Sequence, residues 1–283
     1  MRRFEYFEPT TLGEAAALLA RYGLRAQPLA GGTDLLVELK EQLRRADCVV
    51  NIKRIPGMAG LSYEPREGLR IGALVTAREI ELSRFVLEHY PNLVQAVREL
   101  GSIQVRNRAT IVGNVCRASP SADTLPPLIA DGGRIEVFGE KGARALALEE
   151  FFTGPGKTVL APGELATAIV LPPPAPRTGK VYLKHGRRKA MELATVGVAV
   201  SLTLDSDVRI VLGAVAPTPI RARRAEEVLR NRALNEALIQ EAAEAAQEES
   251  RPISNVRASA EYRRDMVGVL VRRALEHAER AAQ

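Results

Sequence analysis

The chain has 283 residues, of which 46% are hydrophobic and 26% are charged, and its formal net charge is +6. These proportions exclude a mainly disordered chain, and the length predicts two domains, because one domain usually takes roughly 100 to 200 residues. No apolar run reaches the roughly 20 residues that a membrane span needs. The first five residues have no apolar core, so we expect no secretory signal and a cytoplasmic location.

The N-terminal part of the chain alternates helix and strand signals. Thr11 and Glu14 predict a capping box at the start of a helix, and Gly23 predicts its end in a left-handed cap. Strands are expected over 27–30 and 48–52, and a second helix over 35–43. This order predicts a βαβ-like unit with a glycine turn.

A second group of elements starts near residue 61. Strands are expected over 61–63, 69–74, 134–138 and 166–171, helices after Thr76, after Pro91 and over 124–130, and a polar loop over 104–108. The proline-rich run 172–176 is unsuited to a helix or an inner strand, so it predicts a linker at a domain boundary.

Beyond the prolines the pattern changes to strands followed by helices. Strands are expected over 181–184, 196–204 and 208–215, and helices over 222–231, 235–248 and 258–282. Strands first and helices afterwards predict an α+β layer sandwich.

The sequence gives no metal signal and only a weak nucleic-acid signal. Its two cysteines are too few for an iron–sulfur cluster, which usually takes four thiolates, and its three histidines stand singly. The densest basic run, 221–224, lies beside two glutamates and has no aromatic residue to stack on a base. A solvated helix face is therefore favoured over a nucleic-acid site.

Two glycine-containing segments predict an anion site. In residues 30–34 a strand ends in two glycines, whose backbone N–H groups can point into one concavity, and Thr33 adds a hydroxyl while Asp34 is expected to cap the next helix. Residues 110–114 combine a hydroxyl, a glycine and an amide in a similar way. Neither segment has a Rossmann or P-loop pattern, and a simple tight turn remains the alternative for the first.

These segments resemble a known family. Residues 30–36 and 110–114 are similar to the paired FAD signatures of the flavoprotein subunit of molybdenum hydroxylases, the medium chain of carbon monoxide dehydrogenase, aldehyde oxidoreductase and xanthine dehydrogenase relatives. Residues 105–109, 119–123, 182–188 and 213–219 resemble the same family, so the likeness spans nearly the whole chain.

The resemblance implies an α+β fold in two domains. Residues 1–176 would form an FAD-binding domain of the vanillyl-alcohol-oxidase (PCMH) type, with subdomains 1–58 and 59–176. Residues 177–283 would form the C-terminal α+β sandwich domain of the carbon monoxide dehydrogenase flavoprotein.

The resemblance also implies which residues contact FAD. The pyrophosphate would be wrapped by Leu29, Ala30, Gly31, Gly32, Thr33, Asp34 and Leu35, and faced by Gly101, Thr110, Ile111, Gly113 and Asn114. Asp123 would bond ribityl or sugar hydroxyls, and Leu165 and Lys184 would lie near the ring system, with a surface charge as the alternative for Lys184. No histidine lies in 30–34 or 110–116, so the FAD is expected to be non-covalent, and Cys116 is expected to be a buried apolar residue.

The implied function is electron transfer by one subunit of an oxidoreductase, with no catalytic acid or base on this chain. FAD would take electrons from two-iron two-sulfur clusters on a small subunit, which receives them from a large molybdenum-pterin subunit, and would pass them to an external acceptor. A dimer of heterotrimers is expected. The alternatives are a stand-alone flavin-dependent oxidoreductase of the same fold and a basic nucleic-acid-binding protein.

Overall fold

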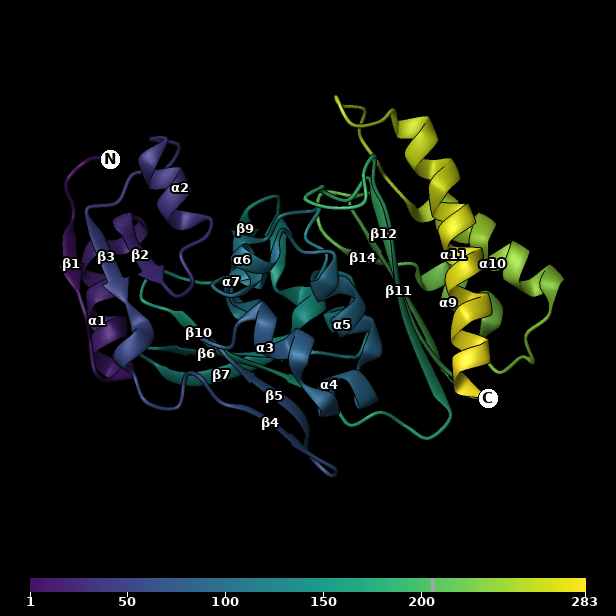
Figure 1. Ribbon diagram of the computed structural model, residues 1–283, viewed down its shortest axis with the longest axis horizontal. Helices are drawn as coiled ribbons and strands as arrows, with labels where there is room; N and C mark the ends of the chain where they lie inside the picture. Colours follow the sequence, from purple (N-terminus) through teal and green to yellow (C-terminus); the bar gives the residue numbers. More distant parts are fainter. Residues whose placement is uncertain (205–206) are drawn as a thin grey trace.

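The structure, a computed structural model, describes residues 1–204 and 207–283. Three sheets follow one another along the molecule, and the N- and C-termini lie at opposite ends (Figure 1). We call them the N-terminal sheet (β1-β3-β2), the central sheet (β4-β5-β10-β6-β7) and the C-terminal sheet (β11-β12-β13-β14). The combination of these sheets with eleven α-helices in the described residues confirms the predicted α+β fold class.

The N-terminal sheet is parallel, as the predicted βαβ-like unit requires. Its elements are β1 (Glu5–Phe7), α1 (Leu12–Tyr22), β2 (Ala26–Leu29), α2 (Leu35–Lys40) and β3 (Cys48–Asn51). The edge strand β1 was not predicted, because its three residues are mostly exposed and form no apolar run.

The ends of α1 differ in detail from the sequence prediction. The Thr11 hydroxyl accepts from the Glu14 N–H at 3.2 Å, but the Glu14 carboxylate accepts from the Thr10 N–H at 2.8 Å, one residue before the expected partner. Gly23 ends the helix with φ +55° and ψ −135°. Its φ is positive, as in the expected left-handed cap, but its ψ lies outside the left-handed helical region. One of the two bonds of the predicted capping box is therefore present, and the other is shifted by one residue.

The central sheet is antiparallel, and six short helices lie between β5 and β6 along the chain. Its strands are β4 (Leu61–Glu64), β5 (Gly68–Gly72), β6 (Arg134–Gly139), β7 (Gly142–Ala147) and β10 (Leu165–Leu171), with a separate hairpin of β8 (Phe152–Gly154) and β9 (Lys157–Thr158). The helices are α3 (Ala77–Leu82), α4 (Arg84–His89), α5 (Pro91–Arg98), α6 (Ile103–Arg106), α7 (Ile111–Arg117) and α8 (Leu125–Ala130).

Two predictions for this part are corrected. The expected polar loop 104–108 contains the single-turn helix α6, which starts where the Ser102 hydroxyl accepts from the Val105 N–H at 3.3 Å. The strand β7 was missed because it is an exposed edge strand without β-branched residues.

The C-terminal sheet is antiparallel and buried on both faces. Its strands are β11 (Thr178–His185), β12 (Val196–Thr203), β13 (Val208–Gly213) and β14 (Ile220–Arg221), followed by α9 (Arg223–Leu229), α10 (Glu236–Glu249) and α11 (Ala260–Ala282). The helices α9 and α11 cover one face, and α5 and α8 pack on the other. On β12, Val198 and Val200 belong to the core under the helices, whereas Ala199 belongs to the core of the central part. Hydrophobic side chains therefore continue along β12 without the alternation of a half-exposed strand.

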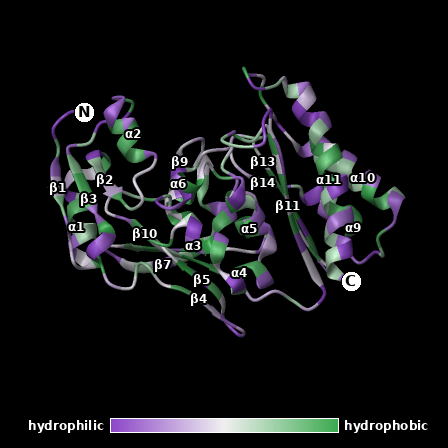
Figure 2. Cartoon of the chain, in the orientation of Figure 1, coloured by the Kyte–Doolittle hydropathy of each residue, from purple (hydrophilic) through white to green (hydrophobic). Residues whose placement is uncertain are grey.

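The hydropathy of each residue is shown in Figure 2. The exposed helix α11 alternates hydrophobic and hydrophilic residues, because only one side of it packs on the sheet. Its buried residues include Val267, Val271, Ala274 and Ala278, at helical spacing. The amphipathic pattern is what made α11 predictable.

A buried ion pair joins the C-terminal sheet to the central part. The Lys180 ammonium on β11 lies 2.9 Å from the Asp131 carboxylate at the end of α8, and both side chains are almost fully buried. The Asn92 amide donates to the other Asp131 oxygen at 3.0 Å, and the Lys180 nitrogen lies 4.1 Å from the centre of the Tyr90 ring. Since the two charges lie on opposite sides of the junction and compensate each other there, the contact fixes how the two parts pack.

Replacing Lys180 with Met would keep the apolar stem and leave the Asp131 charge buried without its partner. We expect Lys180→Met to lower the free energy of unfolding by about 3 to 5 kcal/mol at pH 8. Burial raises the pKa of Asp131, and loss of Lys180 raises it further, so as the pH falls the folded state takes up a proton before the unfolded state does. The loss should therefore shrink as the pH falls.

Urea unfolding at pH 8 and pH 5 measures this effect. Arg25→Ala is the matched control, because the Arg25–Asp47 pair is exposed and should contribute less than about 1 kcal/mol. Equal losses for the two variants would contradict the role given to Lys180.

Candidate functional site

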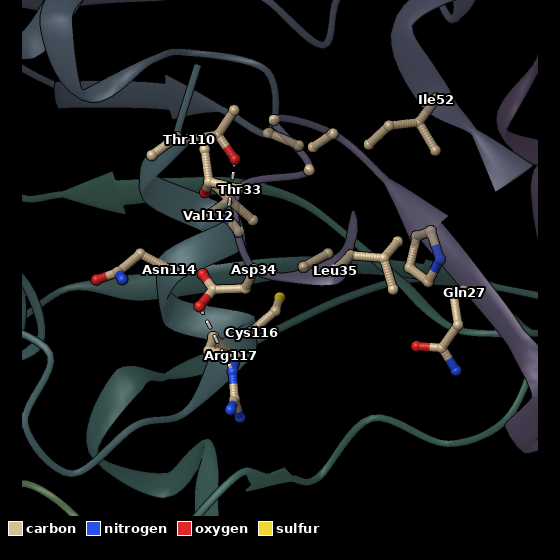
Figure 3. A pocket seen from close by; sticks show the side chains of 18 of the residues that line it. Gln27, Thr33, Asp34, Leu35, Ile52, Thr110, Val112, Asn114, Cys116 and Arg117 are labelled. Carbon is tan, nitrogen blue, oxygen red and sulfur yellow. Dashed lines mark hydrogen bonds and ion pairs between the residues drawn. The ribbon is translucent and has the colours of Figure 1, made fainter. Parts of the chain in front are cut away.

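A cavity of about 260 Å³ lies between the N-terminal and central sheets. It is bounded by the loop from β2 to α2, by α7 and by the start of β10, as Figure 3 shows for the labelled side chains. Its lining residues are Gln27, Pro28, Ala30, Gly31, Gly32, Thr33, Asp34, Leu35, Glu38, Arg44, Ile52, Ala73, Ala109, Thr110, Val112, Gly113, Asn114, Cys116, Arg117, Leu160, Glu164, Leu165 and Ala166. The two glycine-containing segments singled out in the sequence thus line the same cavity.

The two segments touch through their backbones. A Cβ added to Gly31 would lie 2.0 Å from the Arg108 carbonyl oxygen, so no other residue fits at this position unless one of the two backbone segments moves. Gly32 has φ +76°, in the left-handed region that favours glycine. The first glycine therefore permits a close approach of the loops, and the second permits the turn.

The first wall of the cavity offers free backbone donors. Within the described residues, the N–H groups of residues 31–35 have no hydrogen-bond acceptor in the protein. The loop leads directly into α2, and the Leu36 N–H of this helix donates to the Gly32 carbonyl at 3.0 Å. A run of free N–H groups in a concave loop is an anion-binding arrangement.

The second wall is organised by the start of α7. The Thr110 hydroxyl accepts from the Gly113 N–H at 3.1 Å, which caps the helix. The Asn114 carbonyl oxygen accepts from the Thr124 hydroxyl at 2.6 Å, and its NH₂ group has no acceptor in the described residues. Asn114 is therefore held by one end of its amide and can donate into the cavity with the other.

The charged residues of the cavity form ion pairs with one another. The Glu38 carboxylate lies 2.6 Å from the Arg44 guanidinium and 2.8 Å from that of Arg117. Asp34 lies 3.8 Å from Arg117, toward which it points in Figure 3. It is the N-cap residue of α2, as expected, but its side chain makes no capping hydrogen bond. Glu38, Arg44 and Arg117 were not predicted as part of the site, because the contact between α2 and α7 leaves no local pattern in the sequence.

Cys116 lines the cavity, but its thiol has little nucleophilic reactivity. Burial raises the pKa of its thiol to about 12. A thiol with so high a pKa is almost entirely protonated at neutral pH and is a poor nucleophile. This agrees with the expected apolar role.

A second cluster lies at the junction with the C-terminal sheet. The Asp123 carboxylate accepts from the Tyr182 hydroxyl at 2.7 Å and from the Lys184 ammonium at 3.0 Å. Lys184 also donates to the carbonyls of Glu99 at 3.1 Å and Glu192 at 2.7 Å. Its side chain is buried, so it is not the surface charge weighed as the alternative.

The structure brings most of the predicted residues together, but not all of them. Those that line the cavity are Ala30, Gly31, Gly32, Thr33, Asp34, Leu35, Thr110, Gly113, Asn114 and Leu165. Leu29 packs beside the small core around Leu39, and Ile111 lies in the main core. Gly101 forms the turn between α5 and α6, and Asp123 and Lys184 lie in the junction cluster.

The basic run 221–224 is neutralised by ion pairs. Arg221 lies 2.7 Å from Glu226, Arg223 lies 3.1 Å from Glu149, and Arg224 lies 2.8 Å from Glu248. These arginines therefore offer little free charge to a phosphate backbone.

Residues 1–204 and 207–283 contain neither a candidate metal cluster nor a candidate membrane-spanning helix. No group of three or more histidine, cysteine, aspartate and glutamate side chains is placed to hold a metal ion in these residues. No helix there is both long and apolar enough to cross a bilayer.

Comparison with known proteins gives consistent matches along the chain. Residues 2–174 match the family model for the FAD-binding domain in molybdopterin dehydrogenase, and residues 181–278 match that for the CO dehydrogenase flavoprotein C-terminal domain. The chain is 32% identical to the xanthine dehydrogenase FAD-binding subunit of Escherichia coli O157:H7, over 98% of this chain and 96% of that protein. It is 34% identical to the carbon monoxide dehydrogenase medium chain of Hydrogenophaga pseudoflava, over 98% and 97% of the two chains.

Solved structures agree with these matches. The fold is similar to a chain of the reconstituted CO dehydrogenase from Oligotropha carboxidovorans, with a TM-score of 0.94, 33% identity and 99% coverage of both chains. It is also similar to a chain of quinoline 2-oxidoreductase from Pseudomonas putida 86, with a TM-score of 0.91, 27% identity and coverage of 100% of this chain and 99% of that one.

The contact between Gly31 and Arg108 can be tested by adding one methyl group. We expect Gly31→Ala to lower the free energy of unfolding by about 1 to 3 kcal/mol, because the new Cβ forces the two loops apart. Gly13→Ala is the control, since an added Cβ there meets nothing within 4 Å and lies in α1, where alanine is favoured. Urea unfolding compares the two; a loss no larger for Gly31→Ala than for Gly13→Ala would contradict the loop contact.

The junction cluster predicts a pH effect on stability. Burial raises the pKa of Asp123 to about 6, against the opposing effect of Lys184, whereas an unfolded aspartate titrates at about 3.9. Between these two pH values the folded state keeps a proton that the unfolded state has lost. The contribution of Asp123 to the free energy of unfolding therefore falls by about 2 kcal/mol as the pH rises from 4 to 7.

Asp123→Asn removes this titration. The stability of the variant relative to the parent protein should rise by about 2 kcal/mol between pH 4 and pH 7. Urea unfolding across this range measures it, with exposed Asp47→Asn as the control. A relative stability that does not change with pH would show that Asp123 titrates normally.

Proposed function

The chain belongs to the FAD-binding subunits of the molybdopterin dehydrogenase family, and we propose that it holds FAD non-covalently in the cavity between α2 and α7. The protein is thus the flavin subunit of an oxidoreductase complex. When bound, FAD accepts electrons from a donor and passes a pair to an external acceptor. What this chain contributes is the binding, orientation and electrostatic environment of the cofactor.

The observation that carries the proposal is the set of free donors on the two walls. Residues 31–35 and Asn114 line one cavity, and their backbone N–H groups and the Asn114 NH₂ group, respectively, lack protein acceptors within the described residues. A diphosphate offers several acceptor oxygens to such a set, and the contact between Gly31 and Arg108 holds the two walls at a fixed separation. The donor chemistry therefore fits FAD.

The lining side chains fit a diphosphate only in combination with these backbone groups. Asp34, Glu38 and Glu164 are acidic, while Arg44 and Arg117 are basic, so the side chains alone do not make the cavity positive. Both arginines are engaged with Glu38. Backbone dipoles must then supply most of the attraction for the anion.

The remaining predicted contacts divide between the cavity and the junction. Leu165 lines the cavity, whereas Asp123 and Lys184 lie together at the boundary with the C-terminal sheet. We place the ring end of FAD toward this boundary, beside Gly101, and the pyrophosphate between the loops. Leu29 and Ile111 then support the walls from the cores behind them.

We also propose the domain limits suggested by the sequence. An FAD-binding domain would occupy 1–176, with subdomains 1–58 and 59–176, and the second domain would occupy 177–283. A hydrophobic core built only from residues after the prolines at 172–174 supports this division.

The partners follow from what this chain lacks and from how its relatives differ. Two cysteines are too few for the two-iron two-sulfur clusters, so a small iron–sulfur subunit must carry them, and a large subunit the molybdenum-pterin. Relatives of the same length are named for xanthine, carbon monoxide and nicotinate, which supports a substrate site on another chain. We expect a cytoplasmic dimer of heterotrimers.

The functional proposal is tested by cofactor content and electron flow. Chain purified with its iron–sulfur and molybdenum subunits should release one FAD per chain on acid precipitation, and the bound flavin should be bleached by the substrate of the complex only when the partners are present. Bleaching by a small molecule with the isolated chain would favour a stand-alone oxidoreductase. Absence of FAD from the assembled complex would contradict the proposal.

The role of Asn114 can be tested by a charge change of nearly constant shape. Asn114→Asp keeps the acceptor for the Thr124 hydroxyl but replaces the free NH₂ donor with an oxygen that repels phosphate. We expect FAD to bind at least tenfold more weakly, which is about 1.4 kcal/mol, as measured by quenching of flavin fluorescence. The control is the same exchange at the exposed Asn231, for which affinity should stay within twofold; equal affinities for the two variants would show that residue 114 does not face the diphosphate.

A further inference from the structure

The strand β11 supplies two polar side chains to the junction cluster. Tyr182 and Lys184 are two positions apart on this strand, so they share the face that packs on α5, which lies beside β11 in Figure 1. Tyr182 donates to Oδ1 of Asp123 at 2.7 Å, and Lys184 donates to Oδ2 at 3.0 Å. The Asp123 carboxylate is therefore held at both oxygens, and each oxygen keeps a lone pair for a further donor.

The Tyr182 side chain is fixed by its surroundings. It is buried, and its backbone N–H donates to Gln95 Oε1 at 2.7 Å. Gly197 on the neighbouring strand β12 leaves room for the phenol, because a Cβ added there would lie 2.9 Å from the Tyr182 hydroxyl. Burial, followed by the nearby charge of Asp123, raises the pKa of this hydroxyl well above its usual value, so it remains a donor at neutral pH.

Tyr182 and Lys184 hold the carboxylate in different ways. The Lys184 ammonium also donates to the carbonyls of Glu99 at 3.1 Å and Glu192 at 2.7 Å, so its three protons serve three segments of the chain. Within the described residues the Tyr182 hydroxyl bonds only Asp123. A carboxyl group held at one oxygen can still rotate about its Cβ–Cγ bond, and the second contact, from the tyrosine, fixes its plane.

The segment that carries Asp123 also supports the cavity. The next residue, Thr124, donates its hydroxyl to the Asn114 carbonyl oxygen at 2.6 Å, and Asn114 lines the cavity. Because Asp123 and Thr124 are consecutive, one short segment connects the junction cluster to the α7 wall. A residue that orients Asp123 can therefore act on the cofactor site without lining the cavity.

We propose that Tyr182 is a positioning residue of the cofactor site, which holds the Asp123 carboxylate in the orientation that accepts a hydrogen bond from a hydroxyl of FAD. This inference rests on the proposed function. The competing role is purely structural, in which the same bond only joins the C-terminal sheet to the central part. That role predicts a loss of stability without a change in how FAD binding depends on pH.

The charge state of Asp123 distinguishes the two roles. Asp123 is faced by Tyr182 and Lys184 from β11 and by Glu99 from the end of α5, and burial raises its pKa to about 6 against the two donors. The ionised carboxylate is the better acceptor for a hydroxyl, so FAD should bind more weakly as the pH falls through this value. The Tyr182 hydrogen bond favours the ionised form, so its loss raises the pKa of Asp123 further and moves the weakening to higher pH.

The test removes one buried hydroxyl at a time. Tyr182→Phe keeps the ring and deletes the bond to Asp123. Tyr90→Phe is the matched control, because Tyr90 is also a buried tyrosine of the junction, but its hydroxyl donates to the Pro172 carbonyl at 2.8 Å. The dissociation constant of FAD is measured for the full chain by quenching of flavin fluorescence between pH 5 and pH 8, and Asp123→Asn is measured alongside to identify the group that titrates.

We expect Tyr182→Phe to bind FAD about threefold more weakly at pH 8, and the midpoint of its pH dependence to lie about one pH unit above that of the parent chain. Tyr90→Phe should keep the parent's midpoint, and Asp123→Asn should bind FAD with no pH dependence in this range. Gly197→Ala displaces the Tyr182 hydroxyl from the opposite strand, so it should shift the midpoint in the same direction and provides the test if Tyr182→Phe does not fold.

The outcomes separate the inference from the function on which it rests. One shared midpoint for the parent, Tyr182→Phe and Tyr90→Phe chains, each binding FAD, would overturn the positioning role and leave the flavin function standing. A pH dependence that persists in Asp123→Asn would also overturn it, because another group would then be titrating. Absence of FAD from the assembled complex would overturn both proposals.

Discussion

The close backbone contact between Gly31 and Arg108 is the constraint on which the site depends. It brings the loop after β2 against the segment before α7, although about 80 residues separate them in the chain. Because no side chain intervenes, the two walls keep a fixed distance and their N–H groups can act on one ligand. The cavity is thus built by backbone geometry, and the side chains of Glu38, Arg44 and Arg117 adjust its charge.

The two cavity walls are supported in different ways. The wall at α7 lies on the main core, to which Ile111 and Val115 belong. The wall at α2 lies on a small core of Leu39, Ala46 and Val49, and α2 itself has only six residues. The ion pair between Glu38 on α2 and Arg117 on α7 connects the two walls across the cavity.

Local sequence patterns predicted much of this structure, but they carry no information about contacts between residues that are far apart in the chain. The glycines at 31 and 32 and the long helix α11 act through neighbours in sequence, so their patterns were readable, whereas the cap that Thr110 provides for α7 was not predicted. The joining of the two segments into one site came from the family resemblance. The ion pairs of Arg117 and Lys180 depend on how separate elements face each other, and no spacing in the sequence encodes that.

The burial of the C-terminal sheet on both faces bears on how the molecule comes apart. Tyr182, Ala199 and Val211 belong to the same core as the central sheet, although they lie after the proline run. If the parts before and after the prolines separated, this apolar face would be exposed to water and Asp131 would lose its counter-ion, Lys180. The two sequence domains are therefore not independent modules, and we expect them to melt in a single cooperative transition.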